Sequence, residues 1–148
     1  MNLLITGGSG FIGKKLLLKL PKRNIKTLLL LRKKSRQVKI HKNSKILYDN
    51  LNLNNSSFKK IYRFQPTIII HLAWEGIPNY TKMKSSKNLF DQKKFFKKIL
   101  KISSIKKIIV TGSCFEYDKL NFTSKYFIWA KNTLRKLLDR ECKNKKIF

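Results

Sequence analysis

The residues with the clearest chemical meaning in this sequence are three glycines near its N-terminus. Gly7, Gly10 and Gly13 are spaced three residues apart and directly follow a short apolar run. In a strand-to-helix turn of this kind, the first glycine permits the tight turn, the second lets a pyrophosphate approach, and the third lets the helix pack on the strand. Phe11 and Ile12 open the helix, where free N–H groups and the helix dipole favour an anion. The motif therefore predicts a dinucleotide site, with a plain strand-to-helix turn as the alternative.

The pattern of apolar residues predicts the elements that would position this turn. Short apolar runs predict buried strands at Asn2–Thr6, Ile25–Leu31, Ile46–Tyr48, Thr67–Leu72 and Ile108–Thr111. Amphipathic stretches predict helices at Phe11–Leu20, Ser57–Phe64, Leu89–Ile102 and Tyr126–Glu141. Irregular connections are expected at Arg32–Lys39, Glu75–Lys87 and Asp118–Ser124. This alternation predicts one α/β domain over residues 1–148, built from βαβ units around a parallel sheet.

Four segments of the chain resemble the extended short-chain dehydrogenase/reductase family, in its NAD-dependent epimerase/dehydratase group. They are Thr6–Gly13, Pro66–Trp74, Asn88-Leu89 and Thr111–Tyr117, and they occur in the order and spacing of that family. The resemblance implies a Rossmann-like, doubly wound parallel sheet of about five strands in the order 3-2-1-4-5, with helices on both faces. It also implies that the chain stops after the helix that carries the catalytic Tyr and Lys, so that the C-terminal substrate-binding lobe is missing.

The resemblance also implies further contacts with a cofactor. The backbone that follows His71, at Leu72 and Ala73, is expected to line the cofactor. Asp49 and Asn50, after the third predicted strand, are expected near the adenine. For Asp49 the alternative is a structural one, in which its carboxylate only closes a turn.

Which dinucleotide is bound depends on the residue at the end of the second strand. A Rossmann site usually has an Asp or Glu about 20 residues beyond the glycines, bonded to the ribose 2′-hydroxyl. Here Arg32 follows Gly13 by nineteen residues, with Lys33, Lys34 and Arg36 nearby. A guanidinium suits a 2′-phosphate, so the sequence favours NADP over NAD. Because 35 of the 148 residues are Lys or Arg, a basic residue also falls there by chance, and NAD stays the alternative.

By the same resemblance, the catalytic residues are a Ser, a Tyr and a Lys. Ser113 would hold the substrate oxygen, and Lys131 would bind the ribose and lower the pKa of the Tyr. A phenol with a pKa of about 10 needs a nearby cation to act as a base at neutral pH. Ser113 and Lys131 occupy the positions that the family pattern gives to the Ser and the Lys.

The Tyr does not match. The family has it four residues before the Lys, and that position is Phe127 in this sequence. Tyr126 lies about 140° away from Lys131 around a regular helix, on the core stripe with Ala130 and Leu134. Either Tyr126 substitutes through a distorted first turn, or the proton donor is missing and catalysis is impaired. In the second case Ser113 is a strand-end hydroxyl, and Lys131 still binds ribose.

Composition excludes several classes of protein. The chain is 42% apolar and 28% charged, which predicts a packed core rather than disorder. Two cysteines cannot form a disulfide framework, no signal peptide is recognised, and no apolar run approaches a membrane span, so a cytoplasmic protein is expected. His41 and His71 lie far apart without paired carboxylate or Cys ligands, and no metal site is predicted.

The net charge of +28 makes nucleic-acid binding a function to consider. The 35 basic residues comprise 29 Lys and 6 Arg, spread along the chain together with 12 Asn and 17 Ile. This joint enrichment is typical of an AT-rich coding sequence, and only non-specific nucleic-acid binding at low salt is expected.

Together these observations predict the cofactor-binding half of an NAD(P)-dependent nucleotide-sugar epimerase, dehydratase or reductase. By analogy, a homodimer would form through the helices at Leu89–Ile102 and Tyr126–Glu141. The alternative is a non-catalytic fragment that binds a cofactor or a polyanion.

Overall fold

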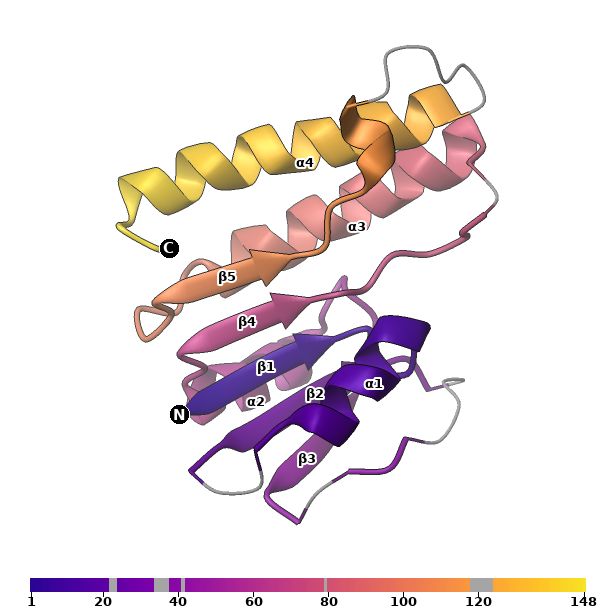
Figure 1. Cartoon of the computed structure of the whole chain (residues 1–148). Helices are drawn as coiled ribbons and strands as arrows, with labels where there is room; N and C mark the ends of the chain where they lie inside the picture. The colour runs from indigo at the N-terminus through magenta and orange to yellow at the C-terminus, as the bar shows by residue number, and fades with distance from the viewer. Residues whose placement is uncertain (22–23, 34–37, 41, 79, 118–123) are drawn as a thin grey trace.

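The fold is an α/β structure, seen in a computed structural model that describes residues 1–21, 24–33, 38–40, 42–78, 80–117 and 124–148. Within these residues, five parallel strands form one sheet in the order β3-β2-β1-β4-β5 (Figure 1). The strands are β1 (Asn2–Thr6), β2 (Lys26–Leu31), β3 (Ser44–Tyr48), β4 (Ile68–His71) and β5 (Lys107–Val110). The helices are α1 (Phe11–Lys19), α2 (Asn55–Phe64), α3 (Lys82–Ile99) and α4 (Lys125–Asn144), with a 3-10 turn, η1 (Cys114–Tyr117). The predicted fold class and strand order are confirmed.

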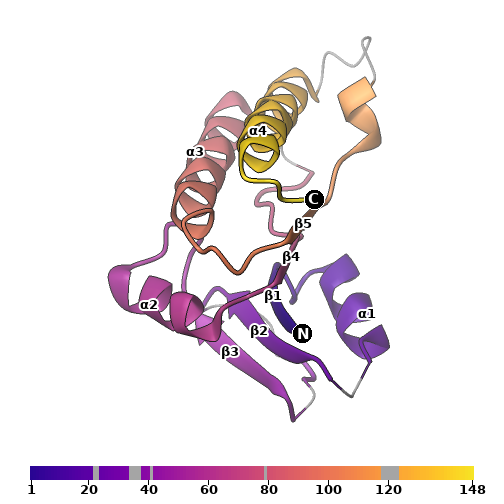
Figure 2. The same ribbon diagram turned by 90° about the vertical axis from the view of Figure 1, so that its left-hand side faces the viewer.

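The helices cover the two faces of the sheet unequally. Helix α1 packs on one face, and α2, α3 and α4 lie on the other (Figure 2). This follows from right-handed crossovers: the chain moves one way from β1 to β2 and the opposite way from β3 through β4 to β5. The larger core lies between the sheet and α2–α4, and includes Leu4, Leu30, Ile69, Phe95, Phe96, Ile99, Ala130 and Leu134. The smaller core lies under α1 and is formed by Leu3, Ile5, Leu29 and Leu31.

The α1 face is left partly open toward β5. Ile70 and Ile109 are register partners in β4 and β5, so their side chains share a face of the sheet. Ile70 packs against the core under α1, which places both residues on the α1 side. Ile109 is 43% exposed, and α1, the helix of the described chain on this face, lies away from β5 (Figure 2).

Two prolines end helices where the sequence predicts it. Helix α1 ends at Lys19, and Leu20 takes an extended conformation before Pro21. Helix α2 ends at Phe64, one residue before the Gln65-Pro66 pair. The residue before a proline avoids the helical region because the proline ring collides with its backbone.

The prediction of an irregular segment over Glu75–Lys87 is wrong for its second half. Helix α3 already begins at Lys82, where the Thr81 hydroxyl caps it by accepting the Lys84 N–H at 3.4 Å. Hydrophobic periodicity misses this turn because its buried residues, such as Ser85, are polar. Gly76 and Pro78 interrupt only the segment before the cap.

The remaining differences are small shifts of boundaries. Helix α3 ends at Ile99 rather than Ile102, and α4 extends from Lys125 to Asn144. The predicted connections lie outside the described residues for half of Arg32–Lys39 and for most of Asp118–Ser124, and His41 lies outside them as well. No helix of the described chain is long and apolar enough to cross a membrane.

Candidate functional site

The glycine turn joins β1 to α1 and is packed too closely for side chains. Gly7 has a φ of 72°, a conformation that favours glycine. A Cβ on Gly7 would lie 2.7 Å from the Ala73 nitrogen, and one on Gly13 would lie 2.4 Å from the Gly7 oxygen. Gly10 is different, because its Cβ would meet only the Gly7 oxygen, at 3.3 Å. Gly7 and Gly13 therefore hold the turn against β4 and α1, while Gly10 leaves its surface accessible.

A groove of about 880 Å³ lies over this turn, at the carboxyl ends of β1, β2 and β4. Ligands of open α/β sheets bind at this edge, where the strand order reverses. Residues predicted to bind a cofactor line much of the groove: Gly7, Gly10, Phe11, Arg32, Asp49, Asn50, Leu72 and Ala73. Three others are placed differently, since Gly13 packs beneath the turn, Ile12 is exposed on α1, and Lys131 stands behind Trp74.

A closed circuit of hydrogen bonds fixes the Ala73 peptide in the wall of the groove. The Ala73 N–H donates to Thr6 Oγ1 at 3.3 Å, and the Thr6 hydroxyl in turn donates to His71 Nδ1 at 2.9 Å. His71 Nε2–H donates to Gln92 Oε1, and Gln92 Nε2 donates to the Ala73 carbonyl at 2.8 Å. Only a neutral imidazole with its proton on Nε2 satisfies every partner. Gln92 is fully buried, and sequence reasoning missed it.

Burial keeps the His71 imidazole neutral. Desolvation lowers the pKa of His71 to about 4, the hydrogen bond to Gln92 opposes this shift, and the charge of Lys131 adds to it. The ring also packs against Phe95 and Phe96, with ring centroids 5.2 and 4.9 Å away. His71 is therefore a packed residue at the end of β4, and it also positions the backbone of the groove.

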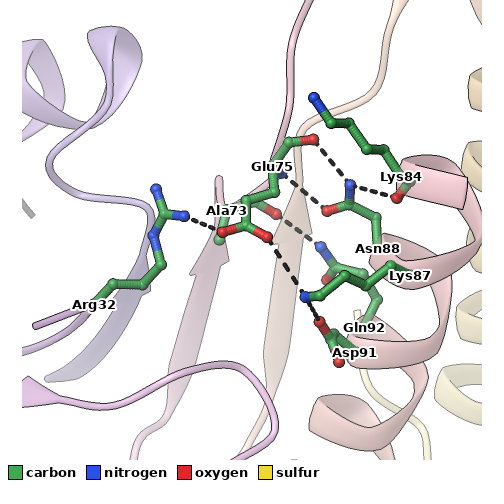
Figure 3. Close-up of polar contacts among 8 residues, drawn as sticks. All are labelled: Arg32, Ala73, Glu75, Lys84, Lys87, Asn88, Asp91 and Gln92. Carbon is green, nitrogen blue, oxygen red and sulfur yellow. Dashed lines mark hydrogen bonds and ion pairs between the residues drawn. The ribbon is translucent and has the colours of Figure 1, made fainter. Parts of the chain in front are cut away.

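Asn88 holds Glu75, which lines the groove two residues beyond Ala73 (Figure 3). The Glu75 N–H donates to Asn88 Oδ1 at 2.9 Å, and Asn88 Nδ2 donates to the Glu75 carbonyl at 2.9 Å. A third bond, from Asn88 Nδ2 to the Lys84 carbonyl at 3.0 Å, ties the amide to α3. Asn88 thus ties the segment after β4 to helix α3.

The Glu75 carboxylate bridges two basic residues from different elements. It forms an ion pair with Arg32 and lies 3.6 Å from Lys87 Nζ, which is also 2.7 Å from Asp91 (Figure 3). The hydrogen bond that Lys87 donates to Asp91 and the charges of Asp91 and Glu75 outweigh desolvation and raise the pKa of Lys87. Sequence reasoning missed Glu75 as a groove residue. The signal was the scarcity of acidic residues, since the chain has only 7 Asp and Glu.

Asp49 closes a turn and lines the groove at the same time. Its carboxylate accepts the N–H groups of Asn50 at 2.8 Å and Asn54 at 3.1 Å. Burial raises the pKa of Asp49, but the hydrogen bond from Ser57, those two backbone bonds and the charge of Lys98 lower it below its ordinary value. Asp49 therefore stays ionised, and the structural role considered for it from the sequence is present.

Lys131 is buried beneath aromatic rings. Its Nζ lies 4.4 Å from the centroid of the Trp74 ring and 5.8 Å from that of Phe127, and it donates to the Thr111 carbonyl at 2.7 Å. Burial lowers the pKa of Lys131, and the charge of Glu116 opposes part of that shift. An ammonium group has three N–H donors, so the contact with Thr111 uses one of them.

The two other predicted catalytic residues are Ser113, which follows β5, and Tyr126, which lies in the first turn of α4. Phe127 is buried on the same face of α4 as Lys131, whereas Tyr126 is half-buried at the start of the stripe that continues with the buried Ala130 and Leu134. The Tyr126 ring has Lys125 Nζ 5.1 Å from its centroid. The Ser113 N–H donates to Glu116 at 2.7 Å, and Ser113 Oγ accepts the Phe115 N–H at 3.3 Å.

The strand order, the glycine turn and the position of the groove define a Rossmann-like α/β protein. The sequence profile of the NAD dependent epimerase/dehydratase family matches residues 3–128. The chain belongs to this family, which confirms the resemblance inferred from its motifs. No curated protein sequence matches the chain.

Solved structures share the fold at low sequence identity. The UDP-glucose 4-epimerase of Thermotoga maritima, solved with UDP-glucose, has a TM-score of 0.77 at 18% identity, over 99% of this chain and 53% of that one. An epimerase from Methanothermobacter thermautotrophicus has a TM-score of 0.80 at 15% identity, over 99% and 48%. The Bordetella bronchiseptica enzyme WbmH, solved with NAD+, has a TM-score of 0.75 at 16% identity, over 95% and 52%. The chain thus spans about half the length of these relatives.

Proposed function

We propose that this chain binds NAD(P) in the groove over the glycine turn, as the cofactor-binding part of a nucleotide-sugar epimerase, dehydratase or reductase. The observation that carries the proposal is the cradle at Gly7 and Gly13, which a Cβ would fill with contacts of 2.7 and 2.4 Å to backbone atoms. A plain turn does not need such close packing. The helix N-terminus beside it supports an anion, and the groove has the volume of a cofactor site.

Different residues of the chain would contact different parts of the cofactor. Gly10 and Phe11 would receive the pyrophosphate, Asp49 and Asn50 the adenosine end, and Leu72 with Ala73 the backbone contacts farther along. When bound, the cofactor would supply hydride transfer at its nicotinamide. The circuit through His71 keeps the Ala73 peptide at a fixed place, which favours a preorganised site.

Arg32 and the family of this chain favour different forms of the cofactor. Arg32 at the end of β2 supports NADP, because its guanidinium suits a 2′-phosphate. The family of this chain is NAD-dependent, and WbmH was solved with NAD+. The preference for NADP over NAD that the sequence favours therefore stays a prediction, which titration with NADH and NADPH tests.

Catalysis is proposed to be weak. Ser113 and Lys131 remain the proposed catalytic residues, but the side chain beside the Lys131 ammonium is Phe127, which has no proton to exchange. Tyr126 comes five residues before Lys131, so the first turn of α4 would have to distort for Tyr126 to replace it. The proposed substrate is a nucleotide-linked sugar, because two relatives were solved with UDP-glucose and with UDP. Dimerisation through α3 and α4 also stays a prediction.

Titration with NADH and NADPH, followed by energy transfer from Trp74 in the groove wall, tests the proposal. Replacing Gly10 by Asp is expected to weaken binding at least about tenfold, because a carboxylate would face the pyrophosphate at the helix N-terminus. Trp129→Phe in all proteins leaves Trp74 as the single tryptophan reporter, since the chain has two.

Gly10→Ala is the matched control, since it adds a Cβ at the same place without charge. It is expected to keep most of the affinity. Equal binding by the Asp and Ala variants would contradict a pyrophosphate site at this turn.

The alternative function is polyanion binding, which the net charge of +28 favours. Its affinity would fall steeply and linearly with the logarithm of salt concentration, whereas cofactor binding would shift modestly. Dinucleotide binding that disappears with salt, and that Gly10→Asp leaves unchanged, would support this alternative.

A further inference from the structure

The Arg32–Glu75 ion pair crosses the groove. Arg32 follows the last residue of β2, and Glu75 comes four residues after the end of β4. Strand β1 lies between β2 and β4 in the sheet, so the two side chains meet beyond the end of β1, on the side of the glycine turn (Figure 3). Both residues line the groove.

Arg32 also borders a second hollow, of about 390 Å³, that it shares with Lys33, Asp49 and Asn50. This hollow is at the end of β2, where a Rossmann site holds the adenosine ribose. The Arg32 guanidinium can therefore pair with an anion on either of two sides. One is the Glu75 carboxylate across the groove, and the other is the hollow at its own strand end.

The Glu75 carboxylate is held in position, where it competes with an anionic ligand for the Arg32 guanidinium. Its backbone is clamped from both sides by Asn88, with bonds of 2.9 Å at its N–H and at its carbonyl. Its carboxylate has a second basic neighbour in Lys87, at 3.6 Å. The side chains of Arg32 and Glu75 are 60% and 46% exposed, so their pair is weak enough for a ligand to replace.

We propose that Glu75 is the residue that sets the preference between NAD and NADP, by competing with the 2′-phosphate for Arg32. This inference rests on the proposed function. A 2′-phosphate carries up to about two negative charges, so it would draw Arg32 from Glu75 into the smaller hollow. The 2′-hydroxyl of NAD has no such charge and leaves the ion pair intact. Glu75 thus acts against NADP only, from the segment that follows β4 rather than from the usual position at the end of β2.

The test measures dissociation constants for NADH and NADPH in the intact chain and in E75Q, R32Q and the double variant. Glu75→Gln is expected to tighten NADPH binding about fivefold, the upper range of an exposed ion pair, and to change NADH binding less than about twofold. In the R32Q background the same substitution is expected to have no effect on either ligand.

Asp91→Asn is the matched control for charge. It removes one carboxylate from the same groove, but Asp91 pairs with Lys87 rather than with Arg32. It is expected to change both dissociation constants by the same small factor. All titrations are run at about 0.15 M salt and again at higher salt, where long-range attraction to the basic surface is screened.

The outcomes separate the inference from the function on which it rests. A gain in NADPH affinity that needs Arg32 and is absent in D91N supports the role of Glu75. If both dinucleotides bind and E75Q leaves their ratio unchanged, or E75Q and D91N act alike, the role of Glu75 is overturned while the cofactor site stands. If no protein binds either dinucleotide, both are overturned.

Discussion

Replacing Gly13 by alanine is expected to lower the free energy of unfolding by about 3 kcal/mol. The added Cβ would lie 2.4 Å from the Gly7 oxygen and 2.6 Å from Gly8 Cα, and both are backbone atoms of the turn. Neither can move aside like a flexible side chain, so α1 must shift away from the sheet. Alanine gains about 1 kcal/mol of helix propensity over glycine, which only partly offsets the collision. Urea unfolding at pH 7, followed by circular dichroism, measures the difference.

Gly10→Ala is the matched variant, because its Cβ meets a single atom at 3.3 Å. Its effect is expected to stay within about 0.5 kcal/mol, as for most accessible positions. Equal stabilities for the two variants would show that the turn opens easily, and would remove the main support for the proposed site.

Acid is expected to destabilise the protein through His71 by about 3 kcal/mol in total. The pKa of His71 is about 4 in the folded chain, against 6.5 for the free side chain. Between these values the unfolded chain binds a proton that the folded chain excludes. Stability from this group is therefore complete above about pH 6.5, and it is lost as the pH falls toward 4. Denaturant midpoints measured from pH 7 to pH 4 give the slope.

The contribution of His71 is isolated by its own titration and by replacement. In the intact chain, the NMR signals of its ring are expected to stay those of a neutral imidazole down to about pH 4, with His41→Gln used to assign them. His71→Asn is expected to flatten the slope between pH 6.5 and pH 4, since carboxylates titrate equally in both proteins. A His71 ring that titrates near pH 6.5 would contradict the buried neutral state.

The fold was predictable because its signals are local. The glycine spacing, the continuous apolar strands and the residues before Pro21 and Pro66 each act within a few positions of the chain. The first turns of α3 show the limit of this reasoning. Their buried residues, Ser85 and Asn88, are polar, so no apolar period marks them, and the cap at Thr81 is a single hydrogen bond.

The candidate site was predictable only where one segment supplies the function. The glycine turn and Leu72-Ala73 are of this kind, and they line one groove. The contacts of Arg32 with Glu75 and of His71 with Gln92 join side chains 43 and 21 positions apart. Such pairs depend on the reach of each side chain and on the register of neighbouring elements. A sequence pattern records neither.

The exposed apolar side chain on β5 means that salt is expected to affect self-association of this chain as well as ligand binding. Ile109 is an exposed apolar side chain on the side of the sheet that α1 covers only in part. A net charge of +28 keeps copies of the chain apart in dilute buffer. The range of that repulsion shrinks from about 10 Å at 0.1 M salt to about 3 Å at 1 M. Salt that suppresses polyanion binding is therefore also expected to let the exposed apolar side chains of two copies come into contact. Light scattering at each high-salt titration point measures such association.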